Sequence, residues 1–138
     1  MKYNIISKFI KDLSFEIPSA EAYVMLDKEI SKYNLVFDVT SKQFKKNIIE
    51  VNTILKLIAN DQVKKKIHVE INITALVSVE GDLNDKISLE KIILVNVPTD
   101  VYPTLYDTFI FLFSNSEIKN ININKKIDFE KLYNERKK

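Results

Sequence analysis

One stretch decides the fold of this chain: Ile10-Lys11-Asp12-Leu13-Ser14-Phe15-Glu16-Ile17-Pro18-Ser19-Ala20. Apolar and polar side chains alternate along it, which is the period of a β-strand with one face against a core. One side carries Phe9, Leu13, Phe15 and Ile17, and the other side carries Ile10, Asp12, Ser14 and Glu16. Pro18 ends the strand because it has no N–H to donate to a neighbouring strand. We therefore expect a β-sheet that begins close to the N-terminus.

The same alternation recurs in three later segments, so the sequence predicts an antiparallel sheet of four strands. The expected strands cover about residues 3–17, 34–40, 48–59 and 63–79. Asn60-Asp61-Gln62 suits a hairpin turn, and residues 20–31 are expected to form a crossover between the first two strands. The only glycine, Gly81, lies in the loop that leaves the sheet.

A helical period follows the sheet. The apolar residues that recur at helical spacing are Tyr102, Leu105, Tyr106, Phe109, Ile110 and Phe113. This pattern predicts a helix over residues 102–114, with Pro103 tolerated in its first turn. Asp128 is a good N-cap and predicts a final helix over residues 128–137. The expected fold is α+β: one domain over residues 1–138, with two C-terminal helices packed on one face of the sheet.

The first of these helices is apolar on more than one side. Phe111 and Leu112 extend the apolar surface beyond the main stripe. Because one sheet covers only one side of a helix, we expect a second subunit to cover the other side. The residues predicted for this oligomer interface are Tyr106, Phe109, Phe111, Leu112 and Phe113.

The composition does not favour catalysis. Hydrophobic residues make up 46% and charged residues 29% of the 138 residues, as in an ordinary globular protein. The chain has no Cys, one His and one Gly, which excludes a thiol nucleophile, a multi-histidine metal site and a glycine-rich phosphate loop. We therefore predict that the protein is not an enzyme and has no metal or cofactor.

Charge and apolar run length limit the possible locations and partners. No apolar run is long enough for a signal peptide or a membrane span, so we expect a cytoplasmic protein without membrane insertion. The net charge is +2, and the basic clusters at residues 64–66 and 136–138 are expected to be solvated. Without stacking aromatics or a readable motif beside them, they do not predict a nucleic-acid partner.

Two groups of residues are candidate binding surfaces. Asp12, Glu16 and Glu70 are expected on the wet face of the sheet, where they serve solubility or dock a cationic partner. His68 shares that face and is expected to be exposed. The second group is either core or the lining of an apolar groove for extended peptide: Phe9, Leu35, Phe37, Val39, Phe129 and Tyr133.

Three stretches resemble the SecB family of protein-export chaperones. The first is Lys11-Asp12-Leu13-Ser14-Phe15-Glu16-Ile17-Pro18-Ser19-Ala20, which is similar to the family's opening strand. The second is Val97-Pro98-Thr99-Asp100-Val101-Tyr102-Pro103, which is similar to its lead into the long helix. The third runs from Ile121-Asn122-Ile123 to Ile127-Asp128-Phe129-Glu130-Lys131-Leu132-Tyr133 and is similar to its final helix.

The resemblance implies an ATP-independent holdase that binds unfolded precursor proteins and delivers them to the SecA motor for export. It implies a homotetramer, built as a dimer of dimers with the long helices between the sheets. In the family, acidic residues of the outer sheet face dock the zinc-bearing tail of the motor, and Asp12, Glu16 and Glu70 match these positions. The family's client grooves are lined from the first two strands, where Phe9, Leu35, Phe37 and Val39 match.

The chain also departs from the family pattern. His68 stands where the family tends to place an apolar contact for the motor. The family's usual Pro-Tyr-Ala-Arg motif is missing from the corresponding segment, Tyr102-Pro103-Thr104-Leu105-Tyr106-Asp107. The chain ends in Arg136-Lys137-Lys138, whereas members of the family often end in an acidic tail. These departures support an alternative: a specialised SecB-like chaperone for a dedicated partner such as an antitoxin.

Overall fold

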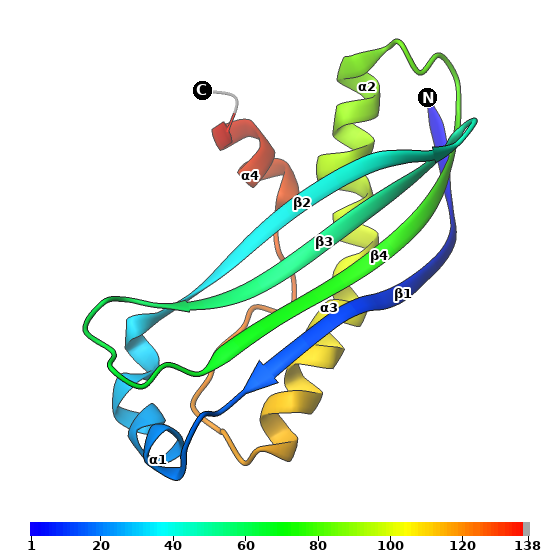
Figure 1. Ribbon diagram of the computed structural model, residues 1–138. Helices are drawn as coiled ribbons and strands as arrows, with labels where there is room; N and C mark the ends of the chain where they lie inside the picture. The colour runs from blue at the N-terminus through cyan, green and yellow to red at the C-terminus, as the bar shows by residue number, and fades with distance from the viewer. Residues whose placement is uncertain (137–138) are drawn as a thin grey trace.

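A four-stranded antiparallel sheet forms one layer of the molecule, and helices lie behind it (Figure 1). The computed structural model describes residues 1–136. The strands are β1 (Lys2–Glu16), β2 (Tyr33–Lys45), β3 (Ile48–Ala59) and β4 (His68–Glu80). Their order in the sheet is β1-β4-β3-β2, so β1 and β2 form the two opposite edges.

A long helical segment crosses the back of the sheet. It consists of α2 (Lys86–Lys91), a π-helical turn η2 (Ile92–Asn96) and α3 (Val97–Asn115). Helix formation therefore starts at residue 86 and not at the expected residue 102. The Asp85 carboxylate begins it by accepting the Ser88 N–H at 3.2 Å. Pro98 has no N–H and its ring crowds the carbonyl four residues earlier, which explains the wide turn just before it.

Two further helices flank the sheet. Residues 20–31 were expected to be a crossover, but Ala20–Glu29 forms α1, followed by the short turn η1 (Ile30–Lys32). The Ser19 hydroxyl caps α1 by accepting the Ala22 N–H at 3.1 Å, and Ala22 and Leu26 bury one face. The last helix, α4, spans Phe129–Arg136. The expected helical residue 137 and the end of the basic cluster lie outside the described residues.

The turn before β4 is longer than expected. The predicted fourth strand began at residue 63, but β4 begins at His68. Val63 and Ile67 are buried, so their apolar alternation imitated a strand. They belong instead to a turn that Tyr33 stabilises, because its hydroxyl accepts the Ile67 N–H at 3.0 Å. The second strand, expected over 34–40, continues to Lys45 before Asn47 turns the chain with a positive φ of 64°.

Two β-bulges in β1 change which side chains face the helices. They lie between Ile5 and Ser7 and between Ile10 and Asp12, and each reverses the alternation of the strand. Phe9 is therefore opposite Thr74 on the outer face, whereas Ile10 is opposite Ile73 on the helix-facing side. The alternation in the sequence had predicted the reverse, with Phe9 on the helix-facing side and Ile10 on the outer face.

The core lies between the inner face of the sheet and α3. Phe109 and Phe113 stack with ring centroids 4.3 Å apart, and Phe15 of β1 meets Phe113 edge-on at 5.5 Å. Phe109 is 0% and Phe113 is 1% exposed within a single chain. Their placement in an oligomer interface is therefore corrected, because side chains buried in the protomer core have no surface to offer a partner. Over residues 1–136, no helix combines the length and apolar character that a bilayer crossing needs.

Candidate functional site

Strand pairing brings the four predicted residues of the outer face together. Glu16 is directly opposite His68, Asp12 is opposite Asn72, and Glu70 is opposite Ser14. Residues that pair directly across an antiparallel ladder share a face of the sheet. Asp12, Glu16, His68 and Glu70 therefore lie on the outer face of β1 and β4, and we call them the outer acidic patch.

Most of the charge in the outer acidic patch is open to solvent. The Glu70 carboxylate lies 3.5 Å from Lys56 Nζ, so it is partly neutralised. Asp12 and Glu16 are exposed, and neither makes a salt bridge within the described part of the chain. The patch therefore has two free carboxylates and one paired carboxylate that a cationic partner can meet.

A second polar feature of the outer face was not predicted from the sequence. Glu50 of β3 is only 8% exposed, and it lies 3.0 Å from Lys11 Nζ and 3.4 Å from Lys42 Nζ. The hydrogen bond from Lys11, and then the charges of both lysines, hold the pKa of Glu50 below its ordinary range. Lys11 lies at the second bulge of β1, and its contact with Glu50 was not predicted because an unbroken alternation was assumed for this strand. This ion-pair group joins side chains of β1, β2 and β3 across the outer face.

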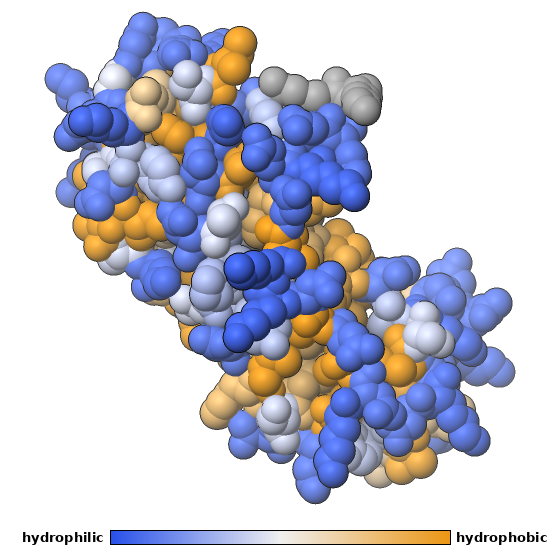
Figure 2. Space-filling model, turned by 180° about the vertical axis from the view of Figure 1, so that it is seen from behind, coloured by the Kyte–Doolittle hydropathy of each residue, from blue (hydrophilic) through white to orange (hydrophobic). Residues whose placement is uncertain are grey.

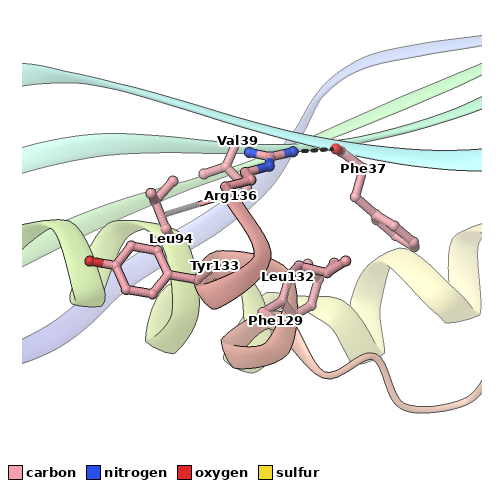
Figure 3. A pocket seen from close by; sticks show the side chains of 7 residues that line it. All are labelled: Phe37, Val39, Leu94, Phe129, Leu132, Tyr133 and Arg136. Carbon is pink, nitrogen blue, oxygen red and sulfur yellow. Dashed lines mark hydrogen bonds between the residues drawn. The ribbon is translucent and has the colours of Figure 1, made fainter. Parts of the chain in front are cut away.

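On the inner face, β2, η2 and α4 form a small pocket, shown in Figure 3. The ring of Phe37 meets the rings of Tyr102 and Phe129 edge-on, with centroids 5.8 Å apart in both pairs. The free volume is about 20 Å³, room for about one water molecule. We call this the aromatic pocket, and its lining residues are Phe37, Val39, Leu94, Phe129, Leu132, Tyr133 and Arg136.

The aromatic pocket unites four of the six residues predicted for the client groove: Phe37, Val39, Phe129 and Tyr133. The first of the other two, Phe9, is 46% exposed on the outer face of β1, at the opposite edge of the sheet. It is therefore removed from the predicted groove. Leu94 was missed because η2 was not recognised as helical, although Ile92–Val95 is one of the longest apolar runs in the chain.

The sixth residue, Leu35, lines a larger hollow further along the inner face of β2. Its volume is about 320 Å³. Seen from behind, hydrophobic atoms gather at the waist of the molecule, between its upper and lower lobes (Figure 2). We call the hollow the waist hollow, and its lining residues are Ile30, Ser31, Tyr33, Asn34, Leu35, Leu57, Asn120, Ile121 and Asn122.

The predicted interface residues of α3 separate into two groups. Phe109 and Phe113 belong to the core, as described above. Tyr106 and Leu112 are half-buried, and Phe111 is 65% exposed. Phe111 is therefore the most exposed of the five predicted interface residues.

Comparisons with known proteins agree with each other. A family model described as "Preprotein translocase subunit SecB" matches residues 1–138. A protein of Pelagibacter ubique named as a protein-export protein SecB is 45% identical over 134 residues, covering 97% of this chain and 96% of the relative. A solved Mycobacterium tuberculosis SecB-like chaperone, in complex with a ChAD peptide from an antitoxin, has a TM-score of 0.64 at 12% identity. That match covers 88% of this chain and 89% of the other and shows similarity of fold.

Proposed function

The chain belongs to the SecB family of protein-export chaperones, and we propose that it acts in the cytoplasm as an ATP-independent holdase for unfolded precursor proteins. One observation carries the proposal. Leu35, Phe37 and Val39 present a row of half-buried apolar side chains along an edge strand, beside the aromatic pocket and the waist hollow. Such a row suits an extended apolar segment better than a compact ligand.

For delivery of clients, we propose that the outer acidic patch docks the basic, zinc-bearing tail of the SecA motor. Asp12 and Glu16 support this role because they are exposed and without a salt bridge among the described residues. Carboxylates in such a place contribute mainly to association rate and orientation. His68 lies directly across from Glu16, and its imidazole would sit at the centre of the docking surface.

The proposed assembly is a homotetramer, a dimer of dimers. Phe111, flanked by Tyr106 and Leu112, supports it as an apolar surface on α3 that the sheet leaves uncovered. In this arrangement the sheets face outward, which keeps the outer acidic patch accessible in every subunit.

The alternative is a chaperone dedicated to one partner, such as an antitoxin. The export role is favoured because the relative that is 45% identical is named as an export protein, whereas the chaperone with the antitoxin peptide resembles this chain in fold alone. Binding of the SecA tail distinguishes the two functions. A dedicated chaperone would bind its partner but would neither bind that tail nor protect diverse precursors.

The holdase function can be tested with a matched pair of variants on β2. Leu35→Lys introduces a charge beside the waist hollow, and Val36→Lys introduces the same charge on the outer face of the same strand. We expect the parent protein and Val36→Lys to suppress aggregation of a slow-folding precursor without nucleotide, and Leu35→Lys to lose most of this activity. Light scattering of the precursor measures the effect, and circular dichroism confirms the fold. Equal protection by both folded variants would remove the inner face of β2 from the client site.

A further inference from the structure

The free edge of β2 is the starting point. β2 is 13 residues long and, within residues 1–136, pairs only with β3, so one side of its backbone faces no other strand of this part of the chain (Figure 1). In a strand, the N–H and C=O of one residue point to the same side, and neighbouring residues point to opposite sides. The Phe37 carbonyl and the Val39 N–H both have hydrogen-bond partners outside the sheet. The backbone N–H and C=O groups of the odd-numbered residues of β2 therefore point to the free edge.

Side chains of the protein itself occupy two of these edge groups. The Arg136 guanidinium donates to the Phe37 carbonyl oxygen at 3.3 Å, and the Asp38 carboxylate accepts the Val39 N–H at 3.0 Å. The Arg136 guanidinium thus takes the place that a backbone N–H of a neighbouring strand would have, and the Asp38 carboxylate takes the place of a backbone carbonyl of such a strand. The edge therefore offers one acceptor and one donor in the spacing of a strand. The acceptor is held by Arg136, which is exposed, and the donor by Asp38, which is half-buried.

We infer that an extended polypeptide segment adds to the free edge of β2 as a fifth strand of the sheet. This inference rests on the proposed chaperone function and names how the client is held. Backbone hydrogen bonds would give binding that tolerates many sequences, because every polypeptide carries the same N–H and C=O groups.

The inner face indicates which segments bind best. A strand added beside β2 lies about 4.8 Å away and points every second side chain to the face that carries Leu35, Phe37 and Val39. Those side chains would enter the waist hollow, whose volume of about 320 Å³ is large enough for apolar side chains. The partner class is therefore an unfolded segment in which apolar residues alternate with polar ones, and not a folded domain or a helix.

Backbone N-methylation gives a direct test. A fluorescein-labelled peptide in which valine alternates with serine and lysine would be compared with two versions, N-methylated on the odd or on the even amides. Only one set of amides can face β2, so we expect one version to bind about tenfold or more weakly and the other to bind like the parent peptide. Fluorescence anisotropy measures the affinities. Equal binding of both versions would overturn the inference.

Variants of the chain test the same edge from the other side. Val39→Pro removes the edge N–H, and proline is tolerated at a free edge, so we expect weaker peptide binding at an unchanged melting temperature. Asp38→Ala releases the Val39 N–H and should bind the peptide about threefold more tightly, whereas Val36→Ala, on the same outer side of β2, should not. If Asp38→Ala and Val36→Ala bind the peptide alike, the Asp38 carboxylate does not occupy a group that the peptide uses.

Two other results separate this inference from the proposed function. If both methylated peptides bind equally and precursors are still protected, the added strand is wrong and the holdase function stands. If no unfolded segment binds at all, both fail. Loss of the native oligomer in Val39→Pro, measured by light scattering, would assign the edge to a second copy of this chain and overturn the inference.

Discussion

Glu117 has a backbone conformation that suits glycine. It follows α3 with a φ of 54°, and the next N–H, that of Ile118, returns to the Phe113 carbonyl at 3.0 Å to close the helix end. The left-handed region costs a residue with a Cβ about 1 kcal/mol or more, and glycine avoids that cost. We expect Glu117→Gly to raise the free energy of unfolding by about 1 kcal/mol, measured by urea denaturation at fixed protein concentration.

The control for this prediction is Glu117→Ala. It removes the negative charge from the C-terminal end of the helix dipole but keeps the Cβ. Alanine should therefore give less than half of the gain. A gain from alanine as large as that from glycine would assign the effect to charge and not to backbone conformation.

Single residues also mark where prediction from the sequence stopped. Apolar Leu13 and Phe15 alternate with Asp12 and Glu16, and this alternation was sufficient to place both carboxylates on the outer face with Glu70. The faces of Phe9 and Ile10 were not predicted correctly, because each bulge inserts one residue and reverses the pattern. The doublets Ile5-Ile6 and Phe9-Ile10 were the available signal, since two adjacent apolar residues interrupt an alternation at each bulge.

At the scale of elements, the buried ring of Phe129 joins α4 to the sheet and to α3. Phe129 is buried and meets Phe37 and Tyr102 edge-on, at 5.8 and 6.0 Å. Replacing a buried phenylalanine by alanine typically costs 3–5 kcal/mol. We expect Phe129→Ala to lower stability by about 3 kcal/mol and to raise amide exchange throughout α4. Leu132→Ala, on the more exposed side of the same helix, should cost less than about 1 kcal/mol, and an equal loss from both variants would contradict this assignment.

Local patterns located the strands better than the helices. The strands alternate over long stretches, so β2 and β3 could be predicted from period alone, apart from the end of β2. α1 was missed although Ser19 is a good cap, because its buried face consists of only Ala22 and Leu26. The start of the long helix was missed because Pro98 reads as a helix boundary, whereas the π-helical turn accommodates it.

At the scale of the whole molecule, the proposed tetramer can be tested at Phe111. This side chain is 65% exposed in the single chain, so Phe111→Glu should leave the fold intact. In a subunit interface the same change buries an unpaired charge, which costs several kcal/mol. We expect multi-angle light scattering to show a tetramer for the parent protein and a smaller species for Phe111→Glu. Ile87→Glu, which replaces an exposed apolar residue of α2, should remain tetrameric, and a monomeric parent protein would overturn the assembly.

The proposed docking of the SecA tail can be tested at the outer acidic patch. Asp12 and Glu16 are exposed, and exposed carboxylates rarely contribute more than about 1 kcal/mol to stability. Asp12→Asn, Glu16→Gln and Glu70→Gln together should therefore leave the melting temperature and precursor protection nearly unchanged. Contact with a basic, zinc-bearing tail depends on these charges, so the triple variant should lose binding to the SecA tail.

Calorimetric titration at low and high salt measures this interaction. The affinity of the parent protein should fall steeply with salt, because charges on an exposed face are screened within about 10 Å at 0.1 M salt. Three exposed lysines in the segment between α3 and α4, changed by Lys119→Gln, Lys125→Gln and Lys126→Gln, provide a control that alters three charges behind the sheet, away from the outer acidic patch. This control should bind the SecA tail like the parent protein. Unaltered affinity in the acidic triple variant, or no binding by the parent protein at any salt, would contradict docking at this patch and favour a dedicated partner.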